Sequence, residues 1–412
     1  MVKENKNWSF SNVSRSETNY LTHGYHKYPA KFIPQIVSKL LIKYSSEGDT
    51  ILDPFGGCGT TLVESKLNNR NSIGIDISDV AVLISKTKTA SINPKKLDIS
   101  NKELLQKFEK IKLRKDYYKN ANERLKYWFK KNEFNLLMEM YKIILKTKDS
   151  KIKRFYLCCF SNILKNCSIW FSKSIKPMRD FKKNIPNPIQ IFTKHLNFMV
   201  EKNKAFYEEI IIKKNLNSTC IMKKGDSRKL FLKDNSINLV ITSPPYVTSY
   251  EYAELHQIST LWFGYADDMK DIKENFVGTS SRKDLSNDFK SKIAEKIIAE
   301  LSKKDKSLAK HSSNYFSDLE KSYKEIYRVL KPSGVACIIL GNTEYKSVKI
   351  KNVEASIEIL NNIGFKQLKI IKRKLSSKTF TPYRDKEGKF TNSKEAANKK
   401  IYNYEYILIF KK

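Results

Sequence analysis

Residues Ser236–Tyr246 read SINLVITSPPY and place a short apolar stretch directly before two consecutive prolines. The apolar part predicts a buried strand, and open α/β sheets bind their ligands at the carboxyl ends of such strands. Each proline lacks an N–H and fixes its own φ, so the loop after the strand is stiff. We interpret Thr242–Tyr246 as a rigid loop for chemistry; the alternative interpretation is a structural turn with a buried tyrosine.

The composition describes a globular chain with a large excess of positive charge. Its 412 residues, 40% of them hydrophobic, suffice for two domains or for one domain with large insertions. Lys and Arg number 78 against 43 Asp and Glu, a net charge of +35. This excess favours a polyanionic partner such as nucleic acid, although a solvated surface in a sequence rich in Lys, Asn and Ile gives the same count.

Signals of metal binding and of membranes are weak. His23 and His26 have no acidic or cysteine neighbour, so they indicate loop packing and we expect no metal site. The amino-terminal segment Met1–Phe10 is polar, and no apolar stretch has the length of a membrane span, which predicts a cytoplasmic chain with no membrane partner. The cysteines lack CxxC spacing and are expected to be reduced core thiols: Cys58, Cys158, Cys159, Cys167, Cys220 and Cys337.

A second site signal lies in Thr50–Glu64, which reads as a short strand, a glycine turn and a helix start. Glycines let the backbone approach a ligand closely, and the N–H groups at a helix start favour an anionic group such as a carboxylate. Leu62 occupies the third glycine position of the dinucleotide fingerprint, which disfavours a pyrophosphate. Asp76 ends the next predicted strand, where an acid can accept both ribose hydroxyls. Together these features indicate an adenosine-type ligand.

Between the two signals the pattern changes to lysine-rich amphipathic helix. One helix face is expected to hold Leu137, Met140, Tyr141, Ile144 and Leu145. Trp128, Phe129, Trp170 and Phe171 alternate with lysines as on a nucleic-acid surface, but aromatic residues at helical spacing are more often core. We expect residues 1–100 to be the cofactor-binding part of a catalytic domain, residues 101–215 a helical insertion, and residues 216–412 the catalytic part with a second insertion at 266–315.

The remaining elements complete an α/β pattern. Asp226 follows a strand at Cys220–Met222. A helix at Tyr315–Val329 leads through a turn at Leu330–Gly334 into an apolar strand at Val335–Leu340. The chain closes with a helix near residues 350–363 and with two strands, at 367–373 and 404–410, which read as an antiparallel pair.

Four features occur together in the sequence: Asp53-Pro-Phe-Gly-Gly-Cys-Gly-Thr-Thr61, Asp76, Asp226 and Thr-Ser-Pro-Pro-Tyr246. In this combination the chain resembles the S-adenosylmethionine-dependent amino-methyltransferases of DNA, the partners of restriction enzymes. The resemblance covers residues 23–90 and 218–345. It implies a Rossmann-like methyltransferase sheet, mostly parallel with a terminal antiparallel pair and interrupted by helical insertions. The implied partners are double-stranded DNA and a cognate restriction endonuclease of the same site. Which insertion recognises the DNA target stays open, although the order of the motifs favours residues 101–215.

The resemblance also implies roles for individual residues. Asp76 would bind the ribose of S-adenosylmethionine, and Asp226 the adenine amino group. The methionine part would be surrounded by residues of the two segments before and after the first helix: Tyr28, Ala30, Phe32, Asp53, Pro54, Phe55, Gly57, Gly59 and Thr60.

Ser243, Pro244, Pro245 and Tyr246 would form the catalytic loop. An exocyclic amino group is a poor nucleophile because its lone pair is delocalised into the ring, so it needs hydrogen-bond acceptors, which the Ser243 hydroxyl and the Pro244 carbonyl can supply. Tyr246 can stack on a base extruded from the duplex. In the family, Ser-Pro-Pro-Tyr is usual for cytosine and Asp-Pro-Pro-Tyr for adenine, which predicts methylation of cytosine N4.

Three alternatives stay open. They are an N6-adenine DNA methyltransferase, an RNA amino-methyltransferase and a non-catalytic nucleic-acid-binding protein of the same fold. The chain contains no Pro-Cys dipeptide, which argues against methylation of a ring carbon through a cysteine nucleophile.

Overall fold

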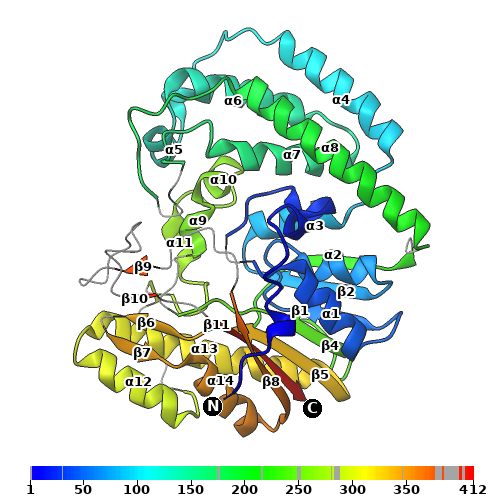
Figure 1. The fold of residues 1–412 in the computed structure, drawn as a ribbon. Coiled ribbons are helices and arrows are strands. Elements are labelled where there is room, and N and C mark those ends of the chain that lie inside the picture. Colours follow the sequence, from blue (N-terminus) through cyan, green and yellow to red (C-terminus); the bar gives the residue numbers. More distant parts are fainter. Residues whose placement is uncertain are drawn as a thin grey trace.

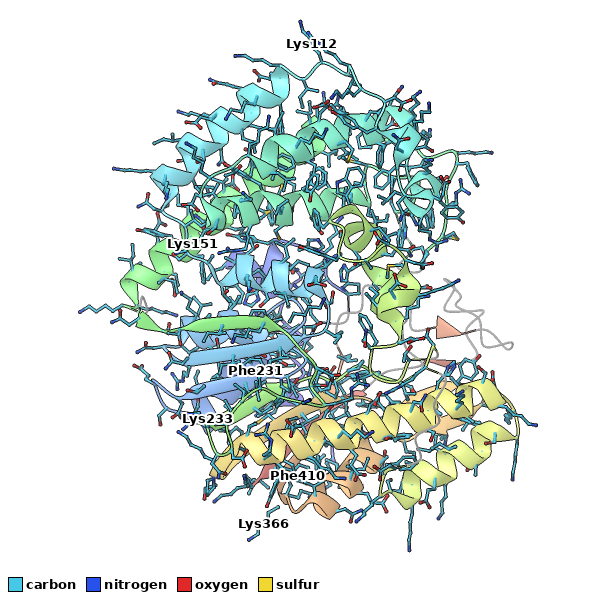
Figure 2. All side chains as sticks on the ribbon, turned by 180° about the vertical axis from the view of Figure 1, so that it is seen from behind. Lys112, Lys151, Phe231, Lys233, Lys366 and Phe410 are labelled. Atoms are coloured by element: carbon cyan, nitrogen blue, oxygen red, sulfur yellow. The ribbon has the colours of Figure 1, made fainter. Side chains whose placement is uncertain are left out.

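One mixed sheet with helices on both faces forms the centre of the molecule, and a lobe of helices lies above it in Figure 1. The computed structural model describes residues 2–29, 31–172, 174, 177–214, 217–247, 252–279, 281–282, 288–345, 347–375, 383–384, 399–400 and 404–412. No helix in these residues is both long and apolar enough to cross a bilayer. Lysines such as Lys112, Lys151, Lys233 and Lys366 lie at the periphery in Figure 2, as their exposure requires.

The sheet has seven strands in the order β3-β2-β1-β4-β5-β11-β8. The first five strands of this order are parallel, and β11 runs antiparallel to both β5 and β8. The predicted Rossmann-like sheet with a terminal antiparallel pair is confirmed. The strands are β1 (Thr50–Asp53), β2 (Asn71–Asp76), β3 (Cys220–Lys224), β4 (Ile237–Thr242), β5 (Leu330–Leu340), β8 (Lys366–Lys374) and β11 (Tyr404–Lys411).

The strand order reverses between β1 and β4. From β1 the chain moves outward to β2 and β3, and it then returns to place β4 on the other side of β1. Leu52 lies opposite Val240 in the register of this parallel pair. The loops that follow β1 and β4 therefore leave the sheet side by side, at the topological switch point where α/β folds bind ligands.

Alternate residues of the central strands face two different cores, as the period of a strand requires. On one face, Ile51, Leu239 and Ile339 pack with Trp8 and α1. On the other face, Leu52, Val240 and Ile338 pack with the long helix α13 and with α14. The helices that cover the two faces are α1 (Pro34–Tyr44), α2 (Thr60–Leu67), α3 (Asp79–Thr89), α12 (Lys292–Ser302), α13 (Lys306–Val329) and α14 (Asn352–Ile363).

The helical lobe has its own core, which explains its aromatic residues. Trp128, Phe129 and Trp170 are buried there, so they are core residues, while Phe171 is partly exposed. Leu145 is 42% exposed, contrary to prediction, because neighbouring helical residues point about 100° apart and Ile144 takes the buried direction. The helices of the lobe are α4 (Pro94–Glu109), α5 (Glu123–Trp128), α6 (Lys131–Leu145), α7 (Ser150–Leu164) and α8 (Pro188–Ile212).

After β4 the chain forms short helices before it returns to the sheet. α13 begins at Lys306, earlier than the predicted Tyr315, because Asp305 caps its polar first turn by accepting from Leu308 N at 3.0 Å. The predicted turn at 330–334 lies within β5, where pairing with β4 shifts between Leu330 and Val335. The other elements are α9 (Tyr252–Leu255), α10 (Gln257–Trp262), α11 (Met269–Lys273) and the strand pairs β6 (Thr343–Tyr345) with β7 (Val348–Ile350) and β9 (Tyr383–Arg384) with β10 (Lys399–Lys400).

Candidate active site

A buried carboxylate joins the two loops at the switch point. Asp53, at the end of β1, is 1% exposed. Its Oδ1 accepts a hydrogen bond from Thr242 Oγ1 at 2.6 Å, and its Oδ2 accepts from Thr61 Oγ1 at 2.8 Å. Thr242 ends β4 and begins the loop Thr242–Tyr246, the proline loop, and Thr61 lies in the first turn of α2. The Asp53 side chain therefore fixes the proline loop relative to the glycine turn.

Burial raises the pKa of Asp53 to about 6, although the hydrogen bonds from Thr242, Thr61 and the Phe55 amide oppose the shift. The protein itself thus uses both carboxylate oxygens. The sequence analysis predicted that Asp53 lies beside the methionine part of a cofactor. In the structure its carboxylate instead links the glycine turn to the proline loop through hydrogen bonds.

The glycine turn is folded tightly against its neighbours. Gly59 has φ +79°, and a Cβ at this position would lie 2.3 Å from Ser85 Oγ of α3. Gly57 has φ +47°, and a Cβ there would lie 3.4 Å from the Tyr28 ring. Positive φ favours glycine at both positions, and at Gly59 the close approach of Ser85 also requires it. The turn therefore presents bare backbone toward Tyr28.

Asp76, at the end of β2, is a second carboxylate that organises the turn. Its Oδ2 accepts from Gly57 N at 2.8 Å and its Oδ1 from Ser78 N at 2.9 Å. Burial raises the pKa of Asp76 against these hydrogen bonds. The side chain is partly exposed, and each oxygen can accept a further hydrogen bond, as a ribose diol would require.

Asp226 has a partner that sequence reasoning did not anticipate. Arg228 Nε donates to both oxygens of Asp226, at 2.9 and 3.0 Å, and Arg228 Nη2 lies 2.6 Å from Oδ2. The same guanidinium pairs with the buried Asp318 of α13 at 3.1 Å. An adenine amino group would therefore share the Asp226 carboxylate with Arg228.

The proline loop leaves β4 with Ser243 and Tyr246 partly exposed and Pro244 buried. Pro245 between them is also partly exposed. The Tyr246 hydroxyl donates to Glu405 Oε1 at 3.1 Å, and Arg373 donates to the other carboxylate oxygen. Glu405 and Arg373 belong to the antiparallel strands β11 and β8, and no local sequence motif marks them.

The other predicted cofactor residues do not all lie together. Tyr28 lies against the glycine turn and stacks on His256 with ring centroids 4.8 Å apart. Phe32 instead packs into the core beneath α1. Pro54 and Thr60 are buried and Phe55 is partly exposed, and Ala30 lies outside the described residues. His23 contacts Glu64 at 2.8 Å and His26 contacts Ser161 at 3.0 Å.

Two lysines beside the glycine turn were missed from the sequence. Lys88 is fully buried, and within the described part of the chain its Nζ has no hydrogen-bond partner. Lys31 is partly exposed, and its Nζ donates to Asn19 Oδ1 at 2.7 Å and to His23 O at 3.1 Å. Burial would raise the pKa of the Cys58 thiol, but the charges of Lys88 and Lys31, together with polar contacts to Thr60 and Lys88, lower it, which places both lysines near the turn.

A sequence signal for Lys88 did exist. It falls on the apolar stripe of α3, one turn after Ile84, where a lysine is unusual.

Among the described residues, no group of three or more His, Cys, Asp or Glu is arranged to hold a metal ion. The six cysteines are unpaired, and all except the partly exposed Cys220 are buried.

These features fit an adenosine-containing cofactor with an anionic group. The glycine turn gives close access to backbone, Asp76 offers acceptors for a diol, and Lys88 is a buried cation that pairs with no carboxylate among the described residues. A Rossmann-like sheet with these groups at its switch point, beside a rigid proline loop, defines an S-adenosylmethionine-dependent methyltransferase.

Comparison with known proteins gives the family. The family model described as DNA methylase matches residues 2–87 and 237–412, and the chain belongs to that family. It is 28% identical over 403 residues to the type II methyltransferase M.MvaI of Kocuria varians, covering 91% of this chain and 89% of that protein. It is 24% identical to the type II methyltransferase M.BsoBI of Geobacillus stearothermophilus, covering 90% of this chain and 84% of that protein.

Among solved structures, a methyltransferase of Methanosarcina mazei that depends on S-adenosylmethionine covers 94% of this chain and 98% of its own, with 9% identity and a TM-score of 0.32. The family membership makes the chain a DNA methyltransferase of the restriction-modification type, with S-adenosylmethionine as its cofactor.

The buried Asp53 predicts a pH dependence of stability. Its pKa is raised from 3.8 to about 6 in the folded chain, so the native state keeps a proton that the unfolded state loses. This contribution to the free energy of unfolding is complete below about pH 4 and is lost as pH rises through about 6, by about 3 kcal/mol in total.

Urea unfolding of the cofactor-free chain and of Asp53→Asn between pH 4 and pH 7 measures the effect. The stability of the parent chain relative to the variant should fall across this range. A difference that does not change with pH would show that Asp53 titrates normally.

Proposed function

We propose that the chain transfers a methyl group from S-adenosylmethionine to the N4 amino group of cytosine in a specific double-stranded DNA sequence. The observation that carries the proposal is the 2.6 Å hydrogen bond from Thr242 to Asp53. It fixes the first residue of the proline loop to the cofactor loop, so the acceptors of Ser243 and Pro244 begin beside the cofactor. Serine at position 243 favours cytosine over adenine.

In this proposal the proline loop activates the amino group. Bound S-adenosylmethionine supplies an electrophilic methyl group on a positively charged sulfur. The Ser243 hydroxyl and the Pro244 carbonyl accept the two amino hydrogens, which localises the lone pair on nitrogen. Tyr246 stacks on the extruded cytosine and limits its motion. Holding nitrogen and methyl carbon in line then accounts for much of the rate.

The cofactor pocket follows from the same geometry. Asp76 accepts the ribose hydroxyls, and Asp226 accepts from the adenine amino group beside Arg228. The backbone of Gly57 and Gly59, with Tyr28, lies along the methionine part. We assign the methionine carboxylate to Lys88, supported by Lys31, because a buried ammonium without an anion is costly and a carboxylate removes that cost.

Replacing Lys88 with methionine tests this assignment through two opposite effects. The variant should bind S-adenosylmethionine more weakly, by roughly 2 to 3 kcal/mol as for other lost charged hydrogen bonds. Without cofactor it should be at least as stable as the parent chain, since it lacks the buried unpaired charge.

Titration calorimetry and thermal unfolding measure the two quantities. Lys86→Met, on the exposed side of the same helix, is the matched control and should change neither. Unchanged cofactor affinity in Lys88→Met would remove Lys88 from the pocket.

Charge distribution supports the first insertion as the DNA-binding region. Residues 101–215 contain 28 Lys and Arg against 11 Asp and Glu, whereas residues 266–315 contain 11 against 9. The first segment therefore carries +17 of the net charge of +35 and the second only +2, so the first is the better candidate for binding a polyanion. The DNA methylase model also passes over residues 88–236, as expected for a region that differs between enzymes with different targets.

A cluster of arginines and aromatic rings lies on this insertion. The guanidinium of Arg124 lies 5.0 Å from the ring centre of Tyr127, and that of Arg179 lies 4.1 Å from Tyr127 and 4.3 Å from Phe181. Tyr127 is 41% and Phe181 67% exposed. Within the described residues, neither arginine pairs with a carboxylate. Guanidinium groups that lie on exposed rings and have no carboxylate partner suit phosphates and bases.

The cluster is linked to the catalytic side of the molecule. Arg124 Nε and Trp128 Nε1 both donate to Gln257 Oε1, at 3.1 and 3.2 Å. Gln257 begins α10, which follows the proline loop in the chain, and Figure 1 shows α5 on the same side as α9, α10 and α11. We therefore place the DNA along the side of the lobe that carries α5.

The double variant with both Arg124→Ala and Arg179→Ala should bind DNA more weakly. The slope of log affinity against log salt should fall in magnitude by about one to two, because each lost phosphate contact releases about one counterion fewer on binding. Lys112→Ala, Lys151→Ala removes two charges elsewhere: Lys112 lies at the top of the lobe and Lys151 at the edge away from α5 (Figure 2). Equal losses in both double variants would indicate a diffuse charge effect and no binding surface at α5.

Nucleoside mass spectrometry of DNA treated with the enzyme and cofactor tests the central proposal. We expect N4-methylcytosine in double-stranded substrate, and no product from Ser243→Ala or Tyr246→Ala with cofactor affinity retained. N6-methyladenine as the sole product would replace the cytosine assignment with the adenine one, and methylation confined to RNA would remove DNA as the substrate. A restriction endonuclease blocked by the same modification is the proposed functional partner.

A further inference from the structure

The structure assigns Glu405 as the positioning residue of Tyr246, held from behind by Arg373 and the amino-terminal segment. This inference rests on the proposed role of Tyr246 as the surface on which the target base stacks. It does not depend on which base is methylated.

Glu405 meets Tyr246 because of the antiparallel end of the sheet. β11 runs opposite to β5, so the first residues of β11 lie at the edge where the parallel strands end and where the proline loop emerges. Glu405 is the second residue of β11, and its Oε1 accepts from the Tyr246 hydroxyl at 3.1 Å. The ring of Tyr246 lies over Gly341, where an added Cβ would come within 3.5 Å of Cε2. The ring thus lies beside the residue that follows β5, while the hydroxyl is held by β11.

Glu405 is itself held by a buried arginine. Arg373 lies directly opposite Glu405 in the β8 and β11 register and is 3% exposed. Its Nη1 donates to Glu405 Oε2 at 2.5 Å, its Nε to Trp8 O at 2.7 Å and its Nη2 to Ser9 O at 3.2 Å. Every nitrogen of the guanidinium has a partner, so its position is determined by the backbone of residues 8–9. The Glu405 side chain is only 12% exposed and stays beside this cation.

The physical consequence is a phenol hydroxyl that donates to an anion in a poorly hydrated place. Such charge-assisted hydrogen bonds are roughly twice as strong as neutral ones. With Pro245 before it, Gly341 under its ring and Glu405 at its hydroxyl, Tyr246 has little freedom. A rigid ring binds an extruded base without an entropic cost for ordering the side chain.

A double-mutant cycle between Tyr246→Phe and Glu405→Gln tests the assignment. Each single variant should lower kcat by about tenfold, the loss typical of one hydrogen bond to a charged group, with unchanged affinity for S-adenosylmethionine. The double variant should be no slower than Tyr246→Phe, because both changes remove the same contact. Multiplied losses, or a Glu405→Gln variant with parental kcat, would overturn the assignment.

Two further measurements separate this role from a structural one. Glu405→Gln removes the counter-charge of the buried Arg373, so this variant should also lose stability, whereas Tyr246→Phe keeps that ion pair and its thermal unfolding should change little. In both variants, fluorescence of 2-aminopurine at the target position should report a less rigidly held base. Glu325→Gln is the matched control, since Glu325 pairs with Arg328 at 2.8 Å near the amino-terminal start of β5 and should leave kcat unchanged. If Tyr246→Ala retains full activity, the proposed role of Tyr246 fails first, which is distinguishable from failure at Glu405.

Discussion

The hydrogen bonds of the Asp53 carboxylate are the constraint on which the rest of the site depends. This one side chain ends β1 and accepts from Thr61 of α2 and from Thr242 of β4. In the proposed function, methyl transfer requires the glycine turn and the proline loop in one fixed relation, and a geometry error of about 1 Å can cost a factor of a hundred. The raised pKa of Asp53 reflects the burial that such a bracket demands. Burying the Asp53 carboxylate lowers the free energy of unfolding near neutral pH, but it holds the glycine turn and the proline loop at a fixed distance.

Elsewhere in the site, buried charges follow two different patterns. Arg373 is fully paired, with Glu405 and with backbone carbonyls, and it transmits position from the amino-terminal segment to Tyr246. Lys88 lacks a hydrogen-bond partner among the described residues. A paired buried charge stabilises one geometry, whereas an unpaired one favours any ligand that neutralises it. In the proposed function, the first pattern suits the loop that would bind the base, and the second suits the turn that would bind the cofactor.

Arg228 shows how a family motif can be correct in position and incomplete in chemistry. Asp226 follows β3 as the sequence predicts, but its carboxylate is already engaged by an arginine that also pairs with Asp318 of α13. The sequence shows only that Arg228 lies two residues after Asp226. It does not show whether the arginine side chain extends into solvent or folds back to pair with the aspartate. The prediction that Leu145 is buried was wrong for a similar reason. Helical periodicity predicts which residues share one face of α6, but the packing of neighbouring helices decides which residues at the margin of that face are buried.

The sequence by itself determined the strands, the two loops and the nature of the fold, because apolar runs, glycines and prolines act locally on the backbone. Short stretches such as Gly57–Gly59 and Ser243–Tyr246 carry their chemistry in their own residues, so they can be recognised before folding. Only the tertiary structure decided which side chains meet them. Glu405 lies 159 residues from Tyr246, and Arg373 lies 364 and 365 residues from the backbone it binds. Such contacts arise from strand order and register, which depend on the packing of the whole sheet and leave no local pattern.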